Sequence, residues 1–234
     1  MTAWSPKRFW SHAVPEPCDG GYTVRLDARP VRTPAKSPVV LPTLAMAQAI
    51  AAEWDAQTGK VNPATMPCTR AANSAIDKIT PQLDEVVGLL AAYGETDLLC
   101  YRATGPEALI QRQAAWDALL DWSATALSAP LAATSGVMHI AQPEASLAAL
   151  KAQVAALTPF QLAAFHDLVA ISGSLILALA VTHRHLALDA AWGLSRIDET
   201  WQAELWGADE DAAAQEALRR AAFIQADRFF RLCE

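Results

Sequence analysis

The chain has 234 residues, of which 53% are apolar and 18% charged, a balance typical of a globular protein with a substantial core rather than a disordered chain. Its formal net charge is −7, and its Lys and Arg residues form no basic stripe. Because nucleic-acid affinity depends largely on clustered Lys and Arg, this charge argues against a nucleic-acid partner.

Neither the N-terminal sequence nor the longest apolar run suggests export or membrane insertion. The N-terminal sequence WSPKRFWSHAV has no apolar run of the kind found in a signal peptide, so we expect none. The longest apolar run, residues 168–181, would span only about 21 Å as a helix, too short for a bilayer, and predicts a buried central helix. The cysteines form no CxxC pair, which favours free thiols in a reducing compartment. They are Cys18, Cys68, Cys100 and Cys233.

Short strands are predicted near the N-terminus. Residues 22–26 alternate between apolar and polar, and residues 29–33 and 38–41 follow after turn residues. Residues 8–14 are a further candidate strand. Glycines and prolines separate these pieces, a pattern that predicts a small sheet built from hairpins.

From Pro42 onward the apolar spacing becomes helical. Thr43 should cap a helix that ends near Gly59. Further helices are expected over 69–79 and 81–93, after Pro106, after Pro143, over 158–181, over 189–207, and after a cap at Asp209. The predicted fold is α+β: a small N-terminal β-rich domain, residues 1–60, followed by a mostly α-helical domain, residues 61–234.

Residues 192–211 contain three of the eight tryptophans. We predict one helix here, with Asp189 as N-cap and Gly207 at its end. One side should pack in the domain as an apolar stripe of Leu194, Ile197, Trp201 and Leu205. A second side mixes aromatic and hydrogen-bonding groups: Trp192, Ser195, Glu199, Gln202 and Trp206. That second side is the candidate for contact with another molecule.

No common catalytic motif is present: GxGxxG, GxxxxGK[ST], GxSxG and HExxH are all absent. Asp198 and Glu199 would point about 100° apart on a helix and could not act as a close acid/base pair. His183 and His185 fall between two predicted helices, where a solvated turn is favoured over a metal site. We therefore expect no enzyme, no catalytic residue, no metal and no cofactor. The alternative is a carboxylate-dependent hydrolase or metal enzyme that uses the Asp198/Glu199 region with His183 or His185.

Partner binding is the favoured hypothesis for residues 192–211, because Trp and Arg beside hydrogen-bonding groups are typical of interface hot spots. A solvated acidic helix end, with Asp209 and Glu210 interacting with a helix N-terminus, is the competing interpretation. Asp198 should be partly buried and need a donor such as an arginine. The candidate partner-binding residues are Trp192, Arg196, Asp198, Glu199, Gln202, Trp206, Asp209 and Glu210.

Several segments resemble one known family. They are LDARPVRTPA at 26–35, LP at 41–42, IAAEWDAQ at 50–57, ETDLLCYRA at 95–103, and WGLSRIDETWQ continued by WGADE within 192–210. In this order they resemble the assembly chaperones for the alpha subunit of the ATP synthase catalytic head. Ala28 departs from the glycine expected after Asp27, which puts a type I′ hairpin turn in doubt.

The resemblance implies a non-enzymatic chaperone that binds the unassembled alpha subunit and releases it on exchange with the beta subunit. It implies a monomer in the bacterial cytoplasm, with eukaryotic relatives in the mitochondrial matrix. Within the matching segments, Trp54, Asp97, Tyr101 and Arg102 are assigned structural roles, and core packing is favoured for Trp54.

Overall fold

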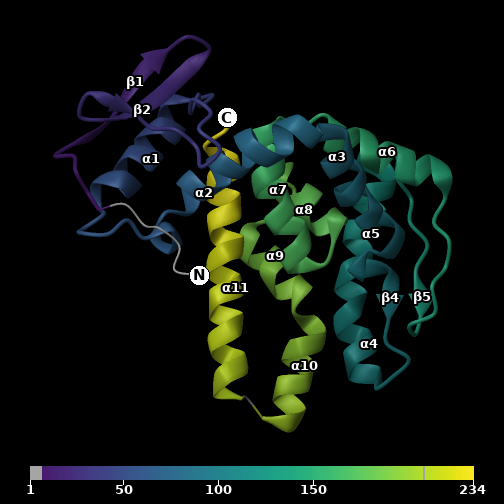
Figure 1. The fold of residues 1–234 in the computed structure, drawn as a ribbon. Helices are drawn as coiled ribbons and strands as arrows, with labels where there is room; N and C mark the ends of the chain where they lie inside the picture. The colour runs from purple at the N-terminus through teal and green to yellow at the C-terminus, as the bar shows by residue number, and fades with distance from the viewer. Residues whose placement is uncertain (1–6, 208) are drawn as a thin grey trace. The chain divides into compact units, whose positions relative to one another are not determined.

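The computed structural model describes residues 7–207 and 209–234 (Figure 1). Short strands precede a mostly helical remainder, which confirms the predicted α+β class. The chain forms two compact units. The first contains the described part of Met1–Leu83 with Thr158–Ala164 and Arg228–Glu234, and the second contains Asp84–Leu157 and Phe165–Asp227. The domain boundary near residue 60 stays a prediction.

The first unit begins with an antiparallel sheet in the order β1-β2-β3. Its strands are β1 (Ala13–Cys18), β2 (Gly21–Leu26) and β3 (Arg29–Pro30). The prediction for 22–26 is confirmed, whereas the first strand begins at residue 13 instead of 8 and the third is only two residues long. Pro30 has no N–H to donate, which is one reason that the third strand is short. Residues 38–41 contribute only isolated bridges, Tyr22 to Leu41 and Arg32 to Pro38.

The turn between β2 and β3 is not type I′, which agrees with the doubt that Ala28 raises about this turn type. Asp27 alone of the two turn residues has a left-handed backbone, with φ at 51°. Aspartate tolerates this region better than most residues. Its carboxylate also accepts hydrogen bonds from the backbone N–H groups of Ser11 and His12, at 3.0 Å each for the shortest contacts. These bonds lower the pKa of Asp27 and occupy donors that would otherwise extend β1.

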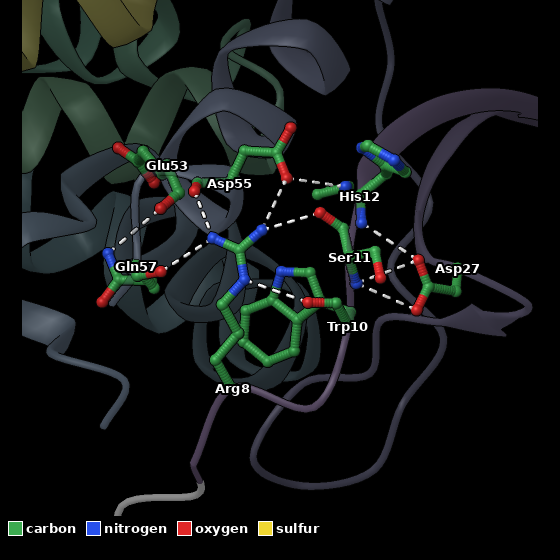
Figure 2. A network of polar contacts seen from close by, with 9 residues as sticks. Arg8, Trp10, Ser11, His12, Asp27, Glu53, Asp55 and Gln57 are labelled. Carbon is green, nitrogen blue, oxygen red and sulfur yellow. Dashed lines mark hydrogen bonds and ion pairs between the residues drawn. The ribbon is translucent and has the colours of Figure 1, made fainter. Parts of the chain in front are cut away.

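Arg8 fastens the segment before β1 to the end of helix α1 (Leu44–Asp55), as Figure 2 shows. Its guanidinium donates to the backbone oxygens of Asp55 at 2.6 Å and Gln57 at 2.8 Å. It also donates to the backbone oxygen of Ser11 at 2.8 Å. The carboxylate of Asp55 accepts from the backbone N–H of Ala13 at 2.9 Å, where β1 begins.

Thr43 caps α1 as predicted, since its side chain accepts from the backbone N–H of Met46 at 3.1 Å. Trp54 on this helix packs edge-on against the buried Trp10, with ring centroids 5.2 Å apart. The next helices run together instead of forming two separate rods over 69–79 and 81–93. They are α2 (Pro67–Ser74), a π-helical turn (Ala75–Ile79), a 3-10 turn (Thr80–Gln82) and α3 (Leu83–Ala91).

The second unit is mainly helical (Figure 1). Its helices are α3 from Asp84 onward, α4 (Glu107–Gln113), α5 (Asp117–Ala126), α6 (Glu144–Ala155), the part of α7 (Pro159–Ser172) from Phe165 onward, α8 (Leu175–Thr182), α9 (Leu188–Ser195), α10 (Ile197–Trp206) and α11 (Glu210–Arg231) up to Asp227. Two short strands, β4 (Tyr101–Arg102) and β5 (Thr134–Ser135), pair in parallel. The helix predicted after Pro106 is interrupted by a 3-10 turn at Ala114–Trp116.

The apolar run at 168–181 is interior, as predicted, but it is not one helix. All residues of α8 from Leu175 to Val181 are buried. Gly173 has φ at +72°, a left-handed conformation that ends α7, and the Ser174 side chain caps α8 by accepting from the N–H of Leu177. Within the described residues, no helix combines the length and the apolarity needed to cross a bilayer.

Asp97 ties the segment after α3 to the start of α8. Its side chain has no exposed surface. One carboxylate oxygen accepts from the Ser174 hydroxyl at 2.7 Å and the Leu99 N–H at 3.0 Å, and the other accepts from the Ile176 N–H at 3.0 Å. Burial raises the pKa of Asp97, while these hydrogen bonds act in the opposite direction.

Candidate partner-binding surface

The predicted single helix over 189–207 is wrong, because the chain breaks at Arg196. Helix α9 ends at Ser195, and α10 begins at Ile197. Arg196 lies between them with φ at −116° and ψ at 14°. The N-cap of α9 is Ala187 and not Asp189, which lies in the first turn. The two continuous sides drawn along one helix therefore do not exist.

Trp192 lies in the core instead of on an exposed side. Only 8% of it is exposed, and its ring packs against Phe223 with centroids 5.8 Å apart. The neighbouring Ser195 is also buried. Arg196 covers the Trp192 ring at 5.5 Å and pairs with Glu199 at 2.9 Å. The expected exposure of Trp192 is thus wrong, and Arg196 has a side chain only 11% exposed.

Helix α10 is held to α4 by three polar contacts. Half-buried Asp198 accepts from the side-chain amide of Gln113 at 2.6 Å. Arg112 forms a bidentate ion pair with Glu204, in which its two terminal nitrogens donate to the two carboxylate oxygens at 3.0 and 2.7 Å. This pairing lowers the pKa of the Glu204 carboxyl. The Arg112 guanidinium also lies over the Trp201 ring at 4.8 Å. The partial burial expected for Asp198 is confirmed, but its donor is an amide and not an arginine.

Two residues of the 95–103 segment bond to Gln113 and so stabilise its contact with Asp198. The Gln113 side chain, which holds Asp198, also accepts from the Ala103 N–H at 2.7 Å. Arg102 donates to the Gln113 backbone oxygen at 2.7 Å and pairs with Asp117 at 2.8 Å. The segment thus contributes to the placement of α10. Tyr101 is half-buried, and its hydroxyl lies 3.3 Å from His139 Nδ1.

The last turns of α10 and the first turns of α11 bury none of their described residues. Every described residue from 202 to 222 is exposed. Trp206 is 86% exposed and Leu205 is 59% exposed. The predicted apolar stripe of Leu194, Ile197, Trp201 and Leu205 therefore does not pack along its whole length, because Leu205 at its end faces solvent. Figure 1 shows that α10 ends and α11 begins at the same end of the pair.

Asp209 caps α11 as predicted. Its carboxylate accepts from the backbone N–H of Asp211 at 3.1 Å. Glu210 occupies the first position of the helix and is exposed, as is Gln202 on α10. Of the candidate partner-binding residues, the structure thus presents Glu199, Gln202, Trp206, Asp209 and Glu210 on the surface.

The residues of the alternative, enzymatic hypothesis have separate partners. Glu199 pairs with Arg196, and Asp198 is held by Gln113. His185 stacks on Trp122 with centroids 4.7 Å apart, and His183 meets the same ring edge-on at 5.9 Å. Burial lowers the pKa of His183. In the part of the chain that the structure describes, no three His, Cys, Asp or Glu side chains are grouped as metal ligands.

The model of the ATP12 chaperone protein family matches residues 7–124. The chain belongs to the ATP12 chaperone family. It is similar to Atp12 from Paracoccus denitrificans, whose crystal structure shares 52% identity and a TM-score of 0.94 over 97% of this chain and 98% of that one. A protein from Agrobacterium tumefaciens is 41% identical, with a TM-score of 0.93 over 98% of this chain and 87% of the other.

A mitochondrial relative is also found. Protein atp12 of Schizosaccharomyces pombe is 24% identical over 219 residues, which is 88% of this chain and 75% of that protein. The likeness to both bacterial structures extends well beyond the 7–124 match, so it includes the α10 and α11 region. The family assignment therefore applies to the whole chain and not to its N-terminal half alone.

Proposed function

We propose that this ATP12-family chaperone binds the unassembled alpha subunit of ATP synthase and assists assembly of the catalytic head. Its membership in a chaperone family carries the proposal. The family resemblance in residues 26–35, 95–103 and 192–210 supports the choice of the alpha subunit as client. The protein would act as a monomer in the bacterial cytoplasm, and release would follow exchange with the beta subunit.

A chaperone that later yields its client needs an interface that is attractive but not permanent. Large apolar side chains supply most of the attraction, while charged groups at the rim favour fast association and exchange. Trp206 provides an exposed aromatic anchor at the end of α10, and Asp209 and Glu210 follow it at the start of α11, whereas Glu199 is exposed in the first turn of α10. We assign these four residues, with Gln202, to the client surface.

Arg196 and Asp198 keep a place in the proposal as positioning residues. Arg196 orients Glu199 through their ion pair, and Asp198 fastens α10 to α4 through Gln113. Trp192 is left out of the client surface because it is buried.

Binding of purified alpha subunit tests the assignment. We expect Glu199→Lys and Glu210→Lys to reduce capture of the alpha subunit in a pull-down, since each reverses a charge on an exposed side chain. Glu85→Lys on α3 is the matched control, because Glu85 is also exposed and in the first turn of a helix. Circular dichroism should show all three variants folded. Unchanged capture by both folded charge-reversal variants would remove this surface from the proposal.

A further inference from the structure

The last turns of α10 and the first turns of α11 bury none of their described residues, and they contact the rest of the second unit through the ion pairs Glu204–Arg112 and Arg220–Asp189. All described residues from 202 to 222 are exposed, and among them Trp206, Leu218 and Leu205 expose 86%, 64% and 59% of their surface. Isolated exposed apolar residues are ordinary, but three large ones on a stretch of two helices that buries no described side chain mark an interaction surface. We name the described residues of 197–222 the α10–α11 hairpin.

The formal charge of this hairpin identifies the kind of partner that fits. Its residues 197–218 contain seven Asp and Glu and no Lys or Arg, and Arg219 and Arg220 bring the whole hairpin to a formal charge of −5. The net charge of the whole chain is −7, so the remaining eighteen acidic residues balance the eighteen basic ones. The acidic excess of the protein therefore lies within this one stretch.

Part of that charge is already neutralised inside the second unit. Glu204 pairs with Arg112, and Glu199 pairs with Arg196. Four exposed carboxylates have no cationic partner among the described residues: Asp209, Glu210, Asp211 and Glu216. The sign of the surface changes after Leu218, where Arg219 and Arg220 follow and Arg220 pairs with Asp189 at 2.9 Å. The negative surface thus ends one turn beyond Glu216.

We propose that the hairpin docks a cationic, amphipathic segment of the client protein. The apolar side chains of that segment would cover Leu205, Trp206 and Leu218, while its Lys and Arg side chains would lie beside the four unpaired carboxylates. Opposite charge attracts such a segment over about a Debye length, whereas an anionic surface is repelled. This inference rests on the proposed client-holding function and adds the chemistry that the surface selects.

The test neutralises the four carboxylates together. The variant is Asp209→Asn, Glu210→Gln, Asp211→Asn and Glu216→Gln, in which asparagine at 209 can still cap α11. The matched control is Asp84→Asn, Glu85→Gln, Asp121→Asn and Glu144→Gln, four exposed carboxylates on other helices of the same unit. Circular dichroism and thermal unfolding establish that both proteins fold.

Two probes are used at low salt, about 20 mM, and at high salt, about 300 mM. One is purified alpha subunit, and the other is a fluorescent peptide of Leu and Lys in a helical amphipathic pattern, compared with its Leu and Glu analogue. We expect wild type and control to bind the alpha subunit and the Lys peptide roughly tenfold more weakly at high salt. The neutralised variant should bind both weakly, with less than about a threefold salt effect.

The outcomes separate this inference from the proposed function. If the neutralised variant binds the alpha subunit as wild type does, with the same salt dependence, the inference is overturned and the client assignment stands. If wild type ignores the alpha subunit but selects the Lys peptide through these carboxylates, the client assignment fails and the inference stands. Equal binding of the Lys and Glu peptides by wild type would also overturn the inference.

Discussion

Two carboxylate-bearing regions of the second unit differ in almost every physical respect. At Asp97 the carboxylate is fully buried and accepts three hydrogen bonds that join two segments of the core. In the α10–α11 hairpin, Asp209, Glu210 and Glu216 are exposed, and Trp206 beside them faces solvent. Burial of a carboxylate without hydrogen-bond donors would cost much free energy of folding. An exposed carboxylate stays hydrated at little cost and remains accessible to a partner. The comparison separates groups that hold the fold from groups free to meet a partner.

Removal of the buried carboxylate should have the largest effect. Asp97→Ala leaves the Leu99 and Ile176 N–H groups and the Ser174 hydroxyl without their acceptor. We expect a loss of about 3 to 5 kcal/mol in the free energy of unfolding, measured by denaturant titration. A loss below about 1 kcal/mol would mean that this cluster does not hold the core.

Trp54→Arg should come next. It places a charge where a half-buried indole packs against Trp10, and we expect a loss of about 2 to 3 kcal/mol. On heating, the variant should unfold at a lower temperature than wild type, and it should lose binding of the alpha subunit only as it unfolds, because the defect acts through folding. Trp54→Phe, which keeps an aromatic ring, is the control. Lost binding by a variant of normal stability would instead place Trp54 in the interface.

The pH dependence of stability probes the same buried carboxyl more gently. Because the pKa of Asp97 is raised in the folded state, its contribution is fully present below about pH 4 and is lost as pH rises through the folded pKa. Wild type should therefore lose stability relative to Asp97→Asn as pH rises over that window. A difference between the two proteins that stays constant, or grows in favour of wild type, would contradict the raised pKa.

The hairpin should show the smallest effect on folding. Leu205→Ser with Trp206→Ser should change the free energy of unfolding by no more than about 0.5 kcal/mol, because both side chains are largely exposed. The affinity for the alpha subunit should fall roughly tenfold or more if Trp206 is an anchor. Calorimetric titration against wild type measures this. A large loss of stability with intact affinity would reverse the roles assigned to the two regions.

Local signals predicted the local features. Thr43 and Asp209 were recognisable caps because a capping side chain acts within three residues of itself. Residues 22–26 alternated as a strand must. The α+β class followed from the change of period near Pro42.

The features that the sequence did not predict depend largely on contacts between residues far apart in the chain. Arg196 interrupts a periodic segment without a proline or glycine at that position. Asp198 meets Gln113 across 85 residues, and Glu204 meets Arg112 across 92, so no spacing along the chain could pair them. At Gly173 the breaker was visible, but the surrounding apolar run favoured a continuous helix.

Backbone hydrogen exchange with and without purified alpha subunit tests the central claim most directly. We predict that the subunit slows exchange of amides within 199–222, where the exposed helices open easily, and leaves the already protected amides of α8 unchanged. Slowed exchange confined to other segments, with 199–222 unaffected, would contradict the claim that the α10–α11 hairpin holds the client.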